Sequence, residues 1–209
     1  MKKLLITIIT AFVFSTSLLA QVDVKVNLLG FTMKNYGGSI GYQFNEKISG
    51  AIYTNLNNYY SMDMIDYHDL MTDESSFSSF SISPEVNFCF NPKENNYNSF
   101  FSVYLRSQNS TIYDMKQMIY SSYNETLSEI TYDINKQSLI FGLGFGEKKI
   151  FKSGIFINGY LGLGYVMISN TKYTDTRVEE LFVNMHTTFP SYMNFRAEFS
   201  IGYRFGKKK

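Results

Sequence analysis

The sequence is poor in cysteine, proline and tryptophan. Its single cysteine, Cys89, excludes an intrachain disulfide. No base lies near Cys89 in sequence, so we interpret it as a small packing residue and not as a nucleophile. Only three prolines and no tryptophan stand against 17 tyrosines and 19 phenylalanines, a composition that favours strands over helices. The length of 209 residues allows one domain of ordinary size.

The first twenty residues have the pattern of a secretory signal peptide. Lys2 and Lys3 precede an apolar run over residues 4–14, and small residues lead to Ala20. The run is short for a membrane-spanning helix of about 20 residues, which disfavours a retained anchor. We expect cleavage after Ala20, so that residues 1–20 are the signal peptide and 21–209 the mature domain. Loss of the two lysines leaves 17 basic and 18 acidic residues, a balance that gives no electrostatic reason to bind nucleic acid.

Residues 191–205 alternate with a period of two, which indicates a strand with two unlike faces. The apolar phase consists of Met193, Phe195, Ala197, Phe199, Ile201, Tyr203 and Phe205. Arg196, Glu198 and Arg204 fall between them. The segment is long enough for a tilted strand to cross a bilayer, which needs about 9–11 residues. In a soluble sandwich the apolar face would meet another sheet, whereas in an outer-membrane barrel it would meet lipid.

Seven earlier segments show related alternation. With the final strand, the predicted strands are 22–31, 39–44, 48–57, 79–90, 99–106, 138–146, 154–168 and 191–205. Pro84 lies inside one of them, and we expect a local bulge there. Short links alternate with long ones, a rhythm typical of up-and-down barrels with short periplasmic turns and both termini on the periplasmic side. The sequence therefore predicts an all-β fold, an eight-stranded antiparallel up-and-down transmembrane β-barrel over residues 21–209.

The end of the chain carries a further pattern. Gly202, Tyr203 and Phe205 are similar to the terminal signal by which the barrel-assembly machinery recognises its substrates, although Gly206 and three lysines follow. In strand pattern and in this ending, the chain resembles the small eight-stranded outer-membrane β-barrels of Gram-negative bacteria, the OmpX and OmpA-barrel-like family. The resemblance implies insertion by that machinery into the lipid of the cell outer membrane.

The polar phase predicts a charge network in the lumen. Its members are Glu85, Arg106, Arg196, Glu198 and Arg204. An eight-stranded barrel has an interior that side chains just fill, so charges there need partners. We favour a structural plug of ion pairs over a gated pore. The opposite phase of the final strand predicts lipid contact by Phe195, Phe199, Ile201, Tyr203 and Phe205, and glycines such as Gly142, Gly144, Gly162 and Gly164 suit a crowded interior.

An enzymatic role is the first alternative. The two histidines, His68 and His186, fall in predicted outer loops, where a lipid A modifying barrel would place a Ser-His-acid site. No spacing separates them from ordinary loop residues. Acidic residues between Asp63 and Glu74 could bind a metal, but their spacing does not match a calcium loop. We therefore assign no catalytic, cofactor-binding or metal residue and predict a protein that is not an enzyme.

The longest insertions are the better functional candidates, because binding residues concentrate on loops held by a rigid scaffold. Alternation continues through 107–135, which predicts a protruding hairpin whose edge could recruit a protein partner by strand addition. Val178 to Met185 has helical spacing and predicts a short helix at the barrel mouth. The prediction is a barrel with a structural or surface-interaction role. A lipocalin-like soluble binder of a small apolar ligand is the remaining alternative, and would place the apolar phase inside.

Substitution of Phe199 and Ile201 by aspartate distinguishes these two orientations. If both side chains face lipid, the double variant will fail to insert, because charge on the lipid face of a transmembrane strand is strongly unfavourable. Fractionation of cells that express the variant and the unaltered protein measures this. Unchanged insertion would show that the faces are assigned the wrong way round.

Overall fold

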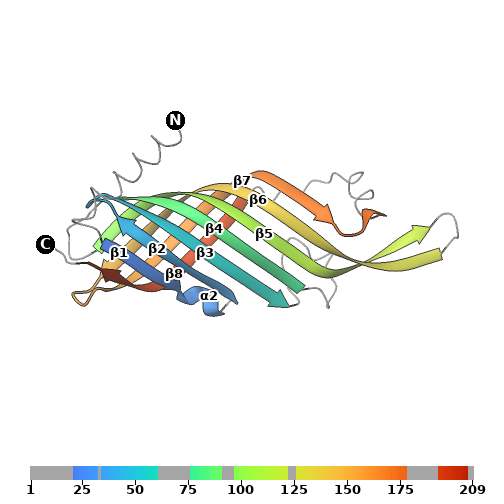
Figure 1. Ribbon diagram of the computed structural model, residues 1–209, viewed down its shortest axis with the longest axis horizontal. Helices are drawn as coiled ribbons and strands as arrows, with labels where there is room; N and C mark the ends of the chain where they lie inside the picture. The colour runs from blue at the N-terminus through green and yellow to red at the C-terminus, as the bar shows by residue number, and fades with distance from the viewer. Residues whose placement is uncertain are drawn as a thin grey trace, which may run out of the picture.

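The protein is a single closed sheet. In the computed structural model, residues 21–32, 34–60, 76–90, 97–121, 126–177 and 193–206 are described. They form β1 (Gln21–Asn27), α2 (Leu28–Thr32), β2 (Asn35–Gln43), β3 (Ile48–Tyr60), β4 (Ser76–Cys89), β5 (Tyr97–Ser121), β6 (Thr126–Ile150), β7 (Ile155–Tyr173) and β8 (Met193–Phe205). Each strand pairs antiparallel with its neighbours in sequence, and β1 pairs with β8 to close the ring (Figure 1). This confirms the predicted eight-stranded antiparallel barrel.

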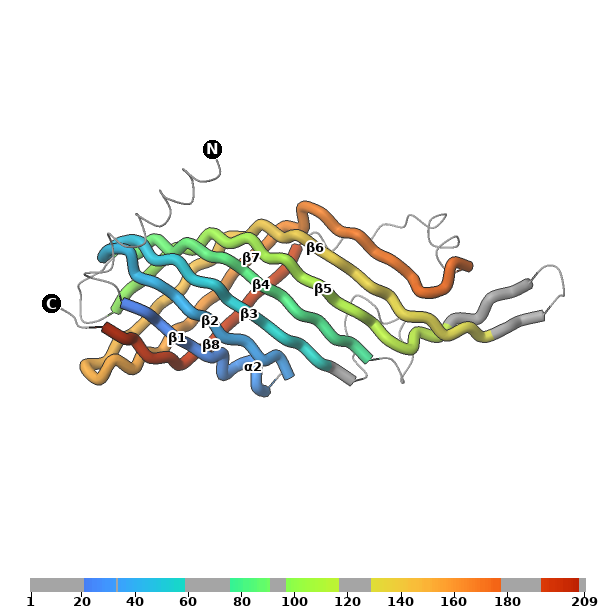
Figure 2. Tube along the Cα trace, in the orientation of Figure 1, coloured from blue at the N-terminus to red at the C-terminus, as the bar shows by residue number. Residues whose placement is uncertain are grey.

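The strand register determines how wide the barrel is. A path that starts at Val24 and moves to the paired residue on each following strand passes through Ile40 on β2 and Ile52 on β3. It reaches Met193 on β8. If the β8–β1 register is continued, Met193 lies opposite position 34. One circuit of the ring therefore ends ten residues beyond its start at Val24, and this offset is the stagger of the barrel. A stagger of this kind requires strands that tilt by about 35–45° to the barrel axis, and it leaves an interior that side chains just fill. Figure 2 shows the strands running obliquely to the long axis of the barrel.

The two ends of the barrel differ. Val22 pairs with Phe205, so the first and last strands meet at one end, here called the terminal end. The end of β2 and the start of β3, the end of β4 and the start of β5, and the end of β6 and the start of β7 lie at this end too. At the opposite end β5 and β6 extend far beyond the other strands (Figure 1). They are 25 residues each and remain paired from Tyr97 with Lys149 to Ser121 with Thr126, which confirms the predicted hairpin.

The two phases of each strand face opposite ways. The outward phase is apolar: Phe195, Ile40 and Leu161 are each about 60% exposed or more. The inward phase is polar, and Glu85, Arg196 and Glu198 are buried. A lipocalin-like barrel requires the reverse, so the apolar-interior alternative is wrong.

Glycines on β6 and β7 make room for aromatic rings in the interior. A Cβ atom at Gly142 would overlap the ring of Tyr104, and one at Gly144 would overlap the ring of Tyr160. Tyr104 and Tyr160 are almost fully buried and pack with Phe100, whose ring stacks on that of Tyr160 at a centroid distance of 6.3 Å. The predicted crowding around the interior glycines is thus confirmed.

The first connection differs from the prediction. The strand expected over 22–31 ends at Asn27, and α2 follows, packed against β8 and β2. A side chain on Gly30 would collide with the backbone of Asn35, so glycine permits this close turn. The predicted start of the second strand at position 39 is also wrong, because β2 already begins at Asn35. Gly37 lies within the strand, where a Cβ would overlap the phenol of Tyr53.

The predicted bulge at Pro84 is wrong as well. Ile82 pairs with Ser107 and Glu85 with Tyr104, so both strands advance three residues and the register is kept. Pro84 also keeps its partner Ile52 on β3. The register shifts instead within β5, between Ile112 and Met115, and where Leu139 and Ile140 of β6 pair with β7.

Substitution of Gly144 by alanine tests the packing of the interior. The added methyl group would overlap the Tyr160 ring, and overpacking of this kind costs about 1–3 kcal/mol. Gly159 is the matched control on β7, since a Cβ there meets nothing within 4 Å. Urea unfolding of the refolded barrels measures the difference, and equal stability of the two variants would contradict this account of the interior.

Candidate functional site in the barrel interior

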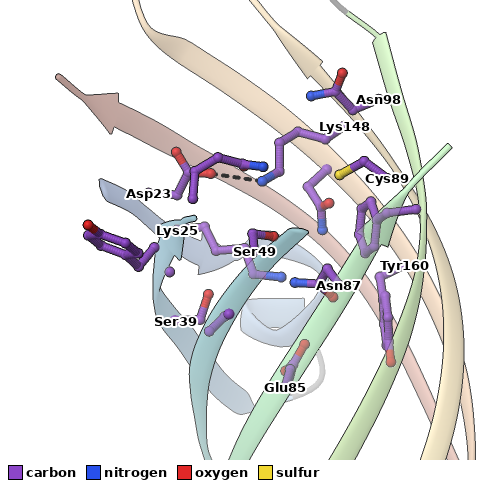
Figure 3. Close-up of a pocket in the computed structure, with 17 residues that line it drawn as sticks. Asp23, Lys25, Ser39, Ser49, Glu85, Asn87, Cys89, Asn98, Lys148 and Tyr160 are labelled. Atoms are coloured by element: carbon purple, nitrogen blue, oxygen red, sulfur yellow. Dashed lines mark hydrogen bonds and ion pairs between the residues drawn. The ribbon is translucent and has the colours of Figure 1, made fainter. Parts of the chain in front are cut away.

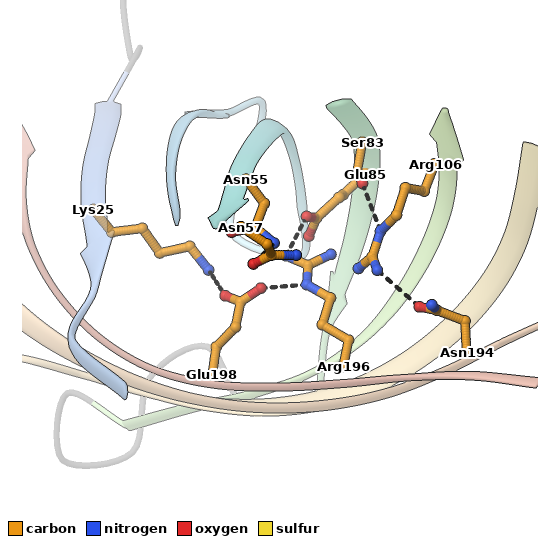
Figure 4. A network of polar contacts seen from close by, with 9 residues as sticks. All are labelled: Lys25, Asn55, Asn57, Ser83, Glu85, Arg106, Asn194, Arg196 and Glu198. Atoms are coloured by element: carbon orange, nitrogen blue, oxygen red, sulfur yellow. Dashed lines mark hydrogen bonds and ion pairs between the residues drawn. The ribbon is translucent and has the colours of Figure 1, made fainter. Parts of the chain in front are cut away.

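The inward phases of three strands converge on a central cluster, defined as Lys25, Glu85, Arg196 and Glu198. Lys25 comes from β1, Glu85 from β4, and Arg196 and Glu198 from β8. Nη2 of Arg196 donates to Oε1 of Glu85 at 2.6 Å, and its Nε donates to Glu198. Nζ of Lys25 donates to Oε2 of Glu198 at 2.9 Å (Figure 4). Two acids and two bases therefore neutralise one another across the barrel axis.

Three tyrosine rings enclose the guanidinium of Arg196. Its Cζ lies 4.0 Å from the ring centroid of Tyr53, 4.6 Å from that of Tyr160 and 5.5 Å from that of Tyr104. Cation–π contacts strengthen when water is excluded, and Arg196 is only 5% exposed. The rings and the ion pairs together fill the middle of the lumen.

Arg106 lies beside the central cluster but has neutral partners. Its Nε donates to the hydroxyl of Ser83 at 3.2 Å, and its Nη1 donates to Oδ1 of Asn194 at 2.8 Å (Figure 4). Its guanidinium also lies 5.4 Å from the ring centroid of Tyr104. The structure thus brings Glu85, Arg196 and Glu198 into direct contact, with Arg106 next to them.

Arg204 lies apart from these residues, in a terminal triad defined as Asp23, Lys148 and Arg204. Two nitrogens of Arg204 donate hydrogen bonds to Asp23, Nε to Oδ1 at 2.6 Å and Nη2 to Oδ2 at 2.7 Å. Nζ of Lys148 donates to the same Oδ2 at 2.9 Å. Two bases therefore share one acid near the terminal end.

Sequence reasoning missed several of these residues for different reasons. Asp23 and Lys25 lie on the polar phase of the first predicted strand, so the alternation was sufficient to predict that they face the interior. Lys148 fell in an expected link, because the end of β6 lacks clear alternation. The tyrosines gave no signal, since an aromatic ring suits either face of a strand.

A cavity adjoins both groups on the terminal side. It offers a volume of about 40 Å³ and is lined by charged and polar side chains that include Asp23, Lys25, Lys148 and Asn158 (Figure 3). Cys89 also lines it, half-buried, as expected for a small packing residue. Lys25 and Glu85 of the central cluster form part of its lining.

No group of three His, Cys, Asp or Glu side chains among the described residues is arranged to hold a metal ion. His68, His186, the acidic segment between Asp63 and Glu74 and the helix expected from Val178 to Met185 all lie outside the described residues. No helix in the described ranges is both long and apolar enough to cross a membrane.

The fold is that of the small eight-stranded outer-membrane β-barrels. The chain is similar to a major outer membrane protein from Thermus thermophilus, at 14% identity and a TM-score of 0.55, with 89% of this chain and 98% of that chain covered. It is also similar to Neisserial surface protein A, at 14% identity and a TM-score of 0.48, with 88% and 94% covered. At these identities the likeness concerns the fold alone.

The family follows from the sequence. The chain belongs to the family DUF3575, whose description is "Protein of unknown function" and whose model matches residues 4–205. No curated protein matches the chain in sequence.

Substitution of Arg196 by methionine tests the central cluster. It leaves Glu85 without its guanidinium in a closed interior, and breaking a buried pair costs about 3–5 kcal/mol. Adding Glu85→Gln should restore part of the loss, because Glu198 retains Lys25. Unfolding in detergent measures both effects. The exposed pair of Arg177 with Asp175 is the control, and an effect of Arg177→Met as large as that of Arg196→Met would contradict the account.

Proposed function

We propose that this protein is a non-enzymatic barrel of the cell outer membrane that acts at the surface through its β5–β6 hairpin. In this proposal residues 1–20 direct export and are removed, and the barrel-assembly machinery inserts the chain. The central cluster closes the interior, so the barrel is a scaffold and not a general porin. The observation that carries the proposal is a long paired hairpin that projects from a closed barrel.

The outer surface supports a membrane location. The predicted lipid-facing side chains of β8 are all exposed, Phe195, Phe199, Ile201, Tyr203 and Phe205. Aromatic pairs gather toward the terminal end, with ring centroids 4.7 Å apart for Tyr203 and Phe205 and 5.1 Å apart for Tyr42 and Phe44. Such rings suit the lipid–water boundary, where outer-membrane barrels carry aromatic girdles.

An apolar cluster and a hydrogen bond stabilise the base of the hairpin. Ile112, Met115, Ile130 and Tyr132 form a buried apolar cluster there. Asp114 adopts φ 57 at the register shift, and its backbone N–H donates to Oδ1 of Asp133 at 3.1 Å. Burial, and to a lesser extent the nearby Tyr173, raise the pKa of the Tyr132 phenol, which keeps that ring neutral. These contacts fix the base of the hairpin where it leaves the barrel.

The hairpin offers strand edges to a partner. The last pair of β5 with β4 is Tyr113 with Ser76, and the last of β6 with β7 is Ile134 with Tyr173. Beyond these pairs, the described ladder of 115–121 and 126–132 joins the two strands only to each other. Backbone groups along such an edge can accept an extended segment by strand addition. We therefore propose an extended peptide segment of another protein as the partner.

Photocrosslinking tests this role. A photoreactive residue at Glu129, which is exposed on the hairpin, should form adducts with protein on intact cells. The same residue at Leu161, exposed on the apolar outer face of β7, is the matched control and should form none. The absence of protein adducts at position 129 would contradict the proposed hairpin interaction. So would equal amounts of adduct at positions 129 and 161.

A further inference from the structure

The interior contacts leave an excess of positive charge. Among the described residues eight charged side chains take part in them, five basic and three acidic. The central cluster is balanced, whereas Arg106 has neutral partners and the terminal triad holds two bases for one acid. A buried charge without a counter-charge is unfavourable. The balance therefore favours an additional negative charge inside the barrel.

Asp23 is the one acid of the terminal triad, and it does not provide this additional negative charge. Both oxygens of Asp23 are already engaged, since Oδ1 accepts from Arg204 and Oδ2 accepts from Arg204 and Lys148. An ammonium has three donors, and one donor of Lys148 goes to Asp23. Lys148 lines the cavity described above, so its charge borders that space (Figure 3).

Asn158 faces Lys148 from the neighbouring strand. The two residues are partners in the β6–β7 register, and both line the cavity. Asn158 is 1% exposed, and neither Nδ2 nor Oδ1 of its amide has a hydrogen-bond partner among the described residues. A buried amide needs a partner. Its N–H groups are donors of the kind that an anion accepts from.

We propose that this cavity binds a small monovalent anion of the halide class, held by the ammonium of Lys148 and the amide of Asn158. The ion supplies the charge that the terminal triad lacks and the acceptor that Asn158 lacks. The volume of about 40 Å³ exceeds the roughly 10–15 Å³ that one water requires, which leaves room for a compact ion.

Chloride-dependent stability tests the site. The mature barrel, refolded in detergent, is unfolded by heat over a chloride series in which sodium gluconate keeps the ionic strength constant. Because a ligand that binds only the folded state stabilises it, the unfolding midpoint should rise with chloride. Lys148→Gln should weaken the apparent chloride affinity about tenfold or more, through loss of a charge-assisted contact. Lys149→Gln is the control, because Lys149 lies beside the outer rings of Tyr97 and Phe151 and should keep the chloride response.

A second variant separates the site from general folding defects. Asn158→Asp places a carboxylate opposite Lys148 and so builds the counter-charge into the chain. This variant should be at least as stable in gluconate as the unaltered barrel is in chloride, and should no longer respond to chloride. A midpoint of the unaltered barrel that is indifferent to chloride would overturn the proposal. So would an undiminished chloride response in Asn158→Asp.

Discussion

The hydrogen bonds between β1 and β8 are the constraint on which the rest of this structure depends. They close the sheet by joining residues 22–27 to residues 200–205, and closure satisfies backbone groups that lipid would otherwise leave without partners. Closure divides every strand into an outer and an inner face with a period of two. Most large aliphatic side chains then lie on the outside, and charged residues such as Glu85, Arg196 and Glu198 are buried in a narrow interior together with aromatic rings.

The narrow interior explains the chemistry found there. Space for the rings of Tyr104 and Tyr160 exists only because glycines face them on the adjacent strands. Arg196 is then held by carboxylates on either side and by aromatic faces around it, which compensates a charge that would otherwise be costly to bury. The same arrangement fills the middle of the lumen with side chains.

Period-two patterns made the strand number, the two faces and the long hairpin predictable from sequence. Glu85, Arg196 and Glu198 could be placed on one face by phase, but their mutual contacts depend on register between strands far apart in sequence. Other features could not be predicted, because the same residue type occurs both in turns or bulges and within regular strands. Gly37 has the pattern of a turn residue although it makes room for Tyr53, and Pro84 fits the ladder without a bulge. Lys148 was missed because alternation fades at the end of β6.

The most direct test of the central claim is the migration of the protein on a detergent gel, with and without boiling, after cell fractionation. A closed barrel in the outer membrane resists unfolding by detergent until it is heated. The account predicts a mobility shift on boiling, confined to the outer-membrane fraction. Recovery of the protein from the soluble periplasm, with the same migration before and after boiling, would contradict it.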